Sequence, residues 1–242
     1  MMKKHKILNK KLWDTPEQLK QSVSDLLIAA VWDFIDFVRT KYGMDIRNAD
    51  VIDIILYGSM ANYFYNTKSD IDLGILLNTK SLEQQYPNLP ILKQMKLYYY
   101  DWTMFHKTKI GKYDVNLSFK SVDLFECDDR YCTGPNYSVL NKKWLFKPII
   151  ISDKEWKQIK KEAYQIYKSF MRDYKKVKKN GFQIQDVRAL FFKIIDDRHI
   201  SVHTYYKQVI TPVYIAYKES KKYLKKMQSA VLLKEENKFT LK

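Results

Sequence analysis

The 242-residue sequence predicts an α+β fold, in which a small mixed β-sheet domain is followed by a C-terminal helical bundle. Two observations predict this fold. The first half contains short apolar runs rich in β-branched residues, separated by longer segments with helical or loop character. The second half instead repeats apolar residues at helical spacing. We therefore expect a sheet domain at residues 1–130, a connecting segment at 131–150 and a basic helical domain at 151–242.

The first predicted element is a helix that begins near Thr15. Thr15 is a typical helix cap, Pro16 suits the first helical position, and Gln18 lies three residues after the cap. Apolar residues follow at helical spacing as far as Phe37, and Gly43 is a typical residue just past a helix end. The sequence therefore predicts one long N-terminal helix.

Three strands and a second helix follow in the first domain. Strands are predicted wherever apolar, β-branched residues run together or alternate with polar ones, and a helix is predicted between the second and third strands. Glycine and proline in residues 121–150 predict a loop with a short strand or two. The strands are expected at 51–57, 70–77 and 112–119, and the helix at 89–106.

The second domain is predicted to consist of helices. Ser152 and Glu155 form a capping-box pattern that opens a long helix, and Gly181 closes it. A shorter helix follows around Val187, and a last one runs from about residue 211 to 227.

The chain is basic, and its charge is unevenly distributed. Of the net charge of +16, residues 151–242 carry +12, from 22 Lys and Arg against 10 Asp and Glu. A strongly basic surface attracts partners that are rich in phosphate, such as nucleic acids. The second domain is therefore expected to contact a polyanion.

Cysteine content and hydropathy predict a cytoplasmic protein that has no membrane partner. Cys127 and Cys132 are too few for a disulfide framework, and free thiols are typical of a reducing compartment. The N-terminus lacks the apolar core of a signal peptide, and the longest uncharged stretch, residues 54–67, is too short to span a bilayer.

One motif points to chemistry. Gly58 and Ser59 follow the first predicted strand, and after ten residues come Asp70 and Asp72. We expect Gly58-Ser59 to open a helix over residues 60–67, and backbone N–H groups at such a position bind phosphate well. Glycine leaves the approach to these groups free.

The acidic residues of the motif predict a metal site. Asp70 and Asp72 are two residues apart on a strand, so their side chains lie on one face. Asp114 on the third predicted strand would complete a cluster of three carboxylates if that strand pairs beside the second. Mg²⁺ prefers oxygen ligands from carboxylates and phosphates, and two such ions can hold both oxygens of an in-line displacement. The pattern thus indicates phosphoryl-type transfer, with Asp114 helping to deprotonate the acceptor.

These residues resemble the DNA polymerase β-like nucleotidyltransferase superfamily, and most of all its minimal (MNT-type) and antibiotic-modifying members. The resemblance covers about residues 50–120. It implies an enzyme that uses Mg²⁺ or Mn²⁺ to transfer a nucleoside monophosphate from an NTP such as ATP, with release of pyrophosphate. It implies metal binding by Asp70, Asp72 and Asp114 and nucleotide binding by Gly58 and Ser59. The acceptors of this superfamily are diverse, so a shared fold does not name one.

A second and shorter pattern lies in the helical domain. Arg198, His203 and Tyr205 resemble the Arg-x4-His-x-Tyr signature of HEPN helical domains, which often accompany MNT-type transferases. The resemblance implies either an RNase site or a substrate-side domain.

The sequence leaves three hypotheses open. The basic second half favours RNA as the acceptor of a nucleotidyltransferase. An alternative is an MNT–HEPN-like enzyme that attaches AMP to a protein tyrosine, such as its own Tyr205, or to a small molecule. The third is a catalytically inactive protein that binds nucleic acid, against which the three carboxylates argue, because they would repel phosphate.

Overall fold

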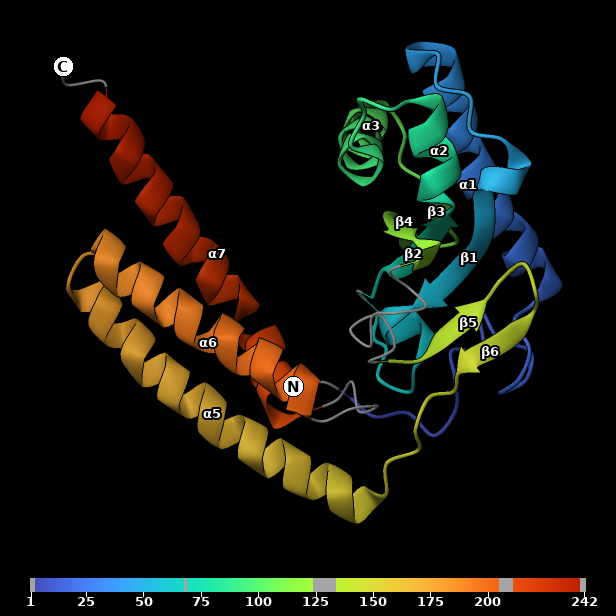
Figure 1. Ribbon diagram of the computed structural model, residues 1–242. Helices are drawn as coiled ribbons and strands as arrows, with labels where there is room; N and C mark the ends of the chain where they lie inside the picture. Colours follow the sequence, from blue (N-terminus) through green and yellow to red (C-terminus); the bar gives the residue numbers. More distant parts are fainter. Residues whose placement is uncertain (1–2, 68, 124–133, 205–210, 240–242) are drawn as a thin grey trace. The chain divides into compact units, whose positions relative to one another are not determined.

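The computed structural model describes residues 3–67, 69–123, 134–204 and 211–239, with side chains as far as residue 194 in α6 and residue 232 in α7 (Figure 1). The chain forms two compact units, residues 2–150 and 151–242. The first contains a mixed six-stranded sheet with helices, and the second contains helices. The predicted combination of a mixed sheet and C-terminal helices is confirmed.

The sheet has the strand order β3-β4-β2-β1-β5-β6. β2 and β4 are parallel, and the other neighbouring pairs are antiparallel. The three predicted strands correspond to β1, β2 and β4, while β5 and β6 lie within the segment expected to be a connection. The strand bounds are β1 Val51–Tyr57, β2 Ile71–Leu77, β3 Lys109–Ile110, β4 Tyr113–Ser121, β5 Asn136–Ser138 and β6 Lys143–Phe146.

One face of the sheet is apolar and packs against α1, which spans Gln21–Tyr42. Successive side chains on a strand point to opposite faces, so Leu117 and Phe119 of β4 share this face. The ring of Phe34 on α1 lies 5.3 Å from that of Phe119 and 5.6 Å from that of Trp102 on α3, which spans Ile91–Phe105. Phe34 is fully buried, so this contact lies in the core of the sheet unit.

The long N-terminal helix begins later than its sequence predicts. α1 starts at Gln21, because Thr15 and Gln18 close a tight turn through mutual backbone hydrogen bonds. The Thr15 hydroxyl accepts the N–H of Glu17 at 3.2 Å, so it caps this turn instead of the helix. The predicted end is confirmed, since Gly43 has φ of +66° and its N–H bonds to the carbonyl of Arg39.

The helix expected over residues 60–67 does not form, so this prediction is wrong. Only a single 3₁₀ turn forms there, η2 (Gly58–Ala61). Asn62 is extended, and its side chain accepts the N–H of Tyr63 at 2.7 Å, which takes the backbone out of helical geometry. The five consecutive residues 60–64 are all buried, a burial pattern that one face of a helix does not give. Two further elements, η1 (Asn48–Asp50) and α2 (Thr79–Gln85), were not predicted.

The helical unit consists of α5 (Asp153–Lys179), α6 (Ile184–Thr204) and α7 (Pro212–Phe239). The predicted capping box is present, because Ser152 accepts the Glu155 N–H at 3.2 Å and Glu155 accepts the Ser152 N–H at 2.9 Å. The three helices share a buried core that includes Phe170, Tyr174, Val187, Leu190, Ile194, Leu224 and Met227. Within the described residues, none of the helices combines the length and apolar content needed to cross a bilayer.

Candidate active site

Gly58 lies directly against the carboxylate of Asp72. Its φ is +76°, a value that residues other than glycine rarely adopt. A Cβ built on Gly58 would be 2.5 Å from Asp72 Oδ2. Since β1 and β2 pair Tyr57 with Asp72, the turn that leaves β1 passes over the start of β2. The sheet therefore brings the two halves of the sequence motif together.

The acidic residues lie on one face of two parallel strands. β2 and β4 pair Asp72 with Asn116, and strand alternation puts Asp114 on the same face as Asn116. Asp70 immediately precedes β2 and accepts a hydrogen bond of 3.1 Å from the Asn116 amide. The carboxylate of Asp114 is exposed and forms an ion pair of 3.1 Å with Lys109 of β3. Asn116 thus belongs to the site, and only the strand register reveals it.

The residue types at this edge suit a hard divalent cation. Carboxylate oxygens are ligands that Mg²⁺ prefers, and the bare backbone of Gly58 lets the Asp72 carboxylate lie against the Gly-Ser turn. Within the described ranges, no three His, Cys, Asp or Glu side chains are gathered closely enough to hold an ion. The side-chain contacts explain this, because Asp70 bonds to Asn116 and Asp114 pairs with Lys109.

The same polar face continues along the sheet from Asp72. The Tyr57 hydroxyl donates to Ser118 Oγ at 3.0 Å, and Ser118 donates to the carbonyl of Leu73 at 3.2 Å. Burial raises the pKa of Tyr57, and the charge of Asp72 raises it further, so this phenol stays neutral. The ammonium of Lys120 lies 4.6 Å from the centre of the Tyr57 ring.

The N-terminal segment contacts the turn that contains Gly58 through buried side chains. The indole N–H of Trp13 donates to the carbonyl of Met60 at 2.9 Å, and both residues are buried. The Asn9 amide donates to the Tyr113 hydroxyl at 3.1 Å and contacts the Met60 sulfur at 3.7 Å. η2 is therefore fixed on one side by this segment and lies against Asp72 on the other.

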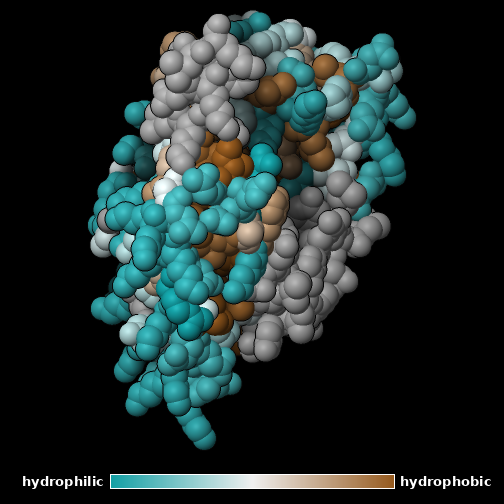
Figure 2. Space-filling view, turned by 90° about the vertical axis from the view of Figure 1, so that its left-hand side faces the viewer, coloured by the Kyte–Doolittle hydropathy of each residue, from teal (hydrophilic) through white to brown (hydrophobic). Residues whose placement is uncertain are grey.

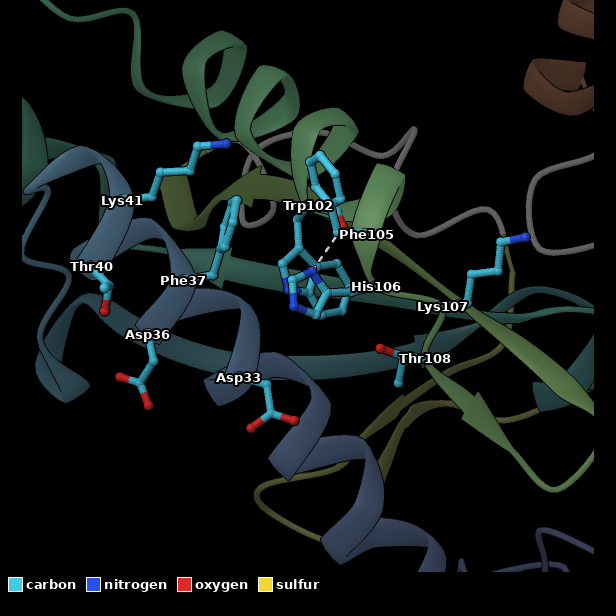
Figure 3. A pocket seen from close by; sticks show the side chains of 10 residues that line it. All are labelled: Asp33, Asp36, Phe37, Thr40, Lys41, Trp102, Phe105, His106, Lys107 and Thr108. Atoms are coloured by element: carbon cyan, nitrogen blue, oxygen red, sulfur yellow. Dashed lines mark hydrogen bonds between the residues drawn. The ribbon is translucent and has the colours of Figure 1, made fainter.

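A cavity of about 660 Å³ lies apart from these residues, between α1 and the end of α3 (Figure 3). Asp33, Asp36 and Phe37 line it from α1. On the other side the rings of Trp102 and His106 stack at 5.3 Å. None of the residues predicted from the motif lines this cavity.

The second predicted pattern is not tested by the structure. Arg198 and His203 belong to α6, but their side chains lie outside the described ones, and Tyr205 lies outside the described residues altogether. Cys127 and Cys132 also lie outside them.

Acidic side chains that could hold divalent cations, placed beside a Gly-Ser turn, suit an enzyme that transfers phosphoryl or nucleotidyl groups, because such transfer depends on positioning and charge neutralisation. The sequence matches the model of the nucleotidyltransferase domain family over residues 33–227, and the chain belongs to this family. The family assigns it a transferase activity of the EC 2.7.7 type with an NTP substrate. The resemblance drawn from the motif is thereby confirmed. No curated protein and no solved structure matches the sequence significantly.

Proposed function

We propose that this protein transfers a nucleoside monophosphate from an NTP to a hydroxyl group of RNA, at the face formed by β2 and β4. The observation that carries the assignment of the site is the approach of Gly58 to Asp72, where a Cβ would lie 2.5 Å from the carboxylate oxygen. A glycine at this point lets the carboxylate lie directly against the backbone of the turn, so that the expected phosphate donors and an acid are close together.

In this proposal each residue has a distinct task. Backbone N–H groups of the Gly58–Ser59 turn and the Ser59 hydroxyl bind the phosphates. They act as single donors, because η2 is only one turn long and has no helix dipole to add. Asp70, Asp72 and Asp114 would hold Mg²⁺ or Mn²⁺, which supplies charge neutralisation when bound. Asp114 can join the other two acids by exchanging its ion pair with Lys109 for the metal.

The proposed reaction is a single displacement at the α-phosphorus. A bond forms between the acceptor oxygen and this phosphorus, the bond to the bridging oxygen of the β-phosphate breaks, and pyrophosphate leaves. The acceptor proton passes to the carboxylate of Asp114, which is exposed and therefore accessible to an acceptor. The Asn116 amide keeps the Asp70 carboxylate oriented toward the site.

Charge supports RNA as the acceptor. Residues 151–242 carry a net charge of +12, and much of it lies on exposed lysines of α5. Figure 2 shows hydrophilic residues over much of this face of the helical unit. A basic surface attracts a polyanion. Separately, a chain with two cysteines suits reducing conditions such as those of the cytoplasm.

The test is incubation of the purified protein with each α-³²P-labelled NTP, Mg²⁺ or Mn²⁺, and total RNA. We expect label in RNA, and we expect Asp72→Asn to remove it. Asp25→Asn is the matched control, because Asp25 is an exposed acid on α1. Equal labelling by Asp72→Asn would overturn the site assignment.

The same experiment separates the alternative acceptors. Label in the protein band would replace RNA by a protein side chain, and label in a small-molecule fraction would replace it by a metabolite. RNA binding that weakens steeply with salt, without label anywhere, would indicate an inactive binding protein.

A further inference from the structure

A lysine on the polar face of the sheet reaches back toward the glycine turn. Lys120 lies on β4 opposite Leu76, four residues beyond Asn116. Its ammonium nevertheless lies 4.6 Å from the centre of the ring of Tyr57, which pairs with Asp72 and immediately precedes Gly58. The side chain therefore runs along the sheet toward the site and not away from it.

Gly74 makes room for this path. A Cβ built on Gly74 would lie 3.5 Å from Lys120 Cε, 3.7 Å from Lys120 Cδ and 3.7 Å from Tyr57 Cε1. The stem of Lys120 thus crosses directly above Gly74, whose open side also faces the Tyr57 ring. These distances are ordinary contacts, so the slot has space for one methyl group but not for a branched side chain.

Tyr57 is a suitable platform for the ammonium. Its hydroxyl is fixed by the hydrogen bond of 3.0 Å to Ser118, so the position of the ring is set. A cation over an aromatic ring is stabilised by the electron density of the ring face.

We propose that Lys120 binds the phosphate chain of the NTP and that Gly74 and Tyr57 position it to do so. This inference rests on the proposed function, because it uses the same site. The ammonium lies beside the residue that leads into the Gly58–Ser59 turn, which is the expected phosphate contact. Lysine binds phosphate as a point charge, and a triphosphate needs more neutralisation than single backbone N–H groups give.

The test measures binding of inorganic tripolyphosphate with Mg²⁺ by calorimetry, which requires no transfer. For Lys120→Met we expect the affinity to fall about ten- to a hundredfold, as for loss of a charge-assisted contact. Lys80→Met is the matched control, because Lys80 is an exposed lysine that pairs with Asp123 at 3.0 Å, outside the site. The affinity of Lys80→Met for tripolyphosphate should equal that of the wild type.

A second pair of variants tests the slot. Gly74→Val should displace the lysine stem and weaken tripolyphosphate binding nearly as much as Lys120→Met does. Gly74→Ala should keep the tripolyphosphate affinity within about threefold of the wild-type value, because the added methyl group meets only ordinary contacts. Thermal unfolding of each variant shows that it is folded.

The outcomes separate this inference from the proposed function. Unchanged tripolyphosphate affinity in Lys120→Met would overturn the role of Lys120, even if labelling of RNA succeeds. If Lys120→Met binds Mn²⁺ more tightly than the wild type but binds tripolyphosphate equally well, the role of Lys120 is only to neutralise the acids, and the proposal fails. Loss of tripolyphosphate binding in Lys120→Met, in a protein that labels nothing, would support the phosphate site while the transfer function fails.

Discussion

Gly58 combines two constraints that act on the same atom. Its φ of +76° disfavours any side chain, and the Asp72 oxygen occupies the space that a Cβ would need. Gly58→Ala should therefore lower the free energy of unfolding by about 2 kcal/mol or more and reduce transfer at least about a hundredfold. Thermal unfolding and the labelling assay measure the two effects.

Gly43→Ala is the control for Gly58. Gly43 has a similar φ of +66°, but a Cβ there would meet nothing within 4 Å. It should show only the backbone cost, about 1 kcal/mol, and normal transfer. Equal losses of stability and transfer in the two variants would mean that the contact of Gly58 with Asp72 has no importance.

Sequence spacing alone predicted that Gly58, Asp70 and Asp72 belong to one site, because Gly58 follows one strand and the two acids come at the start of the next. It did not identify Asn116 or Lys120. Asn116 joins the site through the pairing of β2 with β4, and Lys120 through the curve of its side chain over Gly74. Both depend on neighbours distant in the sequence. The catalytic and metal-binding roles of the acids remain predictions.

At the scale of elements, the hydrogen bond from Trp13 to Met60 connects the N-terminal segment to η2. Trp13→Phe keeps an aromatic ring for the stacking against Trp144 but leaves the Met60 carbonyl without this buried donor. We expect the free energy of unfolding to fall by about 1–2 kcal/mol and transfer to fall several-fold, because the turn loosens. Denaturant titration and the labelling assay measure this.

Trp144→Phe tests whether the effect belongs to the turn. The Trp144 indole also donates a hydrogen bond, of 2.9 Å, but to the Pro16 carbonyl at an exposed position. Its loss should cost less stability and leave transfer unchanged. If both variants reduce transfer equally, the Met60 contact has no special role.

The elements that the sequence predicted well are those with strong apolar periodicity, such as β1 and α5. The errors occur where polar side chains bond to nearby backbone. Thr15 caps a turn before α1, and Asn62 ends the helical geometry after η2. Asn78 starts α2 by accepting the N–H of Ser81 at 3.2 Å. The bonds of Thr15 and Asn62 compete with helix formation, whereas that of Asn78 starts a helix, and the pattern of apolar residues does not reveal any of them.

At the scale of the whole molecule, the proposed RNA acceptor leads to a prediction about the charge of the helical unit. Lys175 and Lys176 are exposed near the end of α5. The double variant Lys175→Glu, Lys176→Glu should weaken RNA binding about tenfold or more at low salt and reduce the salt dependence of the affinity. Lys93→Glu, Lys96→Glu on α3 is the control, since both lysines are exposed on the sheet unit. Equal losses would indicate a general charge effect.

The chain forms two compact units, and we expect acid to affect their unfolding differently. Asp50 is 1% exposed in the sheet unit. Burial pushes its pKa up, but hydrogen bonds from Arg47 and Ser81 outweigh burial and leave the pKa below its ordinary value. A carboxyl with a lowered pKa stabilises the folded state above its unfolded pKa of about 3.9, and this stabilisation is lost as pH falls through the folded pKa.

We therefore expect the sheet unit to lose stability below about pH 4, while the helical unit keeps its own transition. Asp50→Asn should lower the free energy of unfolding by about 1–3 kcal/mol at pH 7 and flatten the acid dependence, because the Arg47 and Ser81 donors lose a charged partner. Tryptophan fluorescence reports mainly on the sheet unit, which contains Trp13, Trp32, Trp102 and Trp144. Circular dichroism reports also on the helical unit. With Asp25→Asn as the control, an acid transition unchanged by Asp50→Asn would mean that other carboxyls carry the pH dependence.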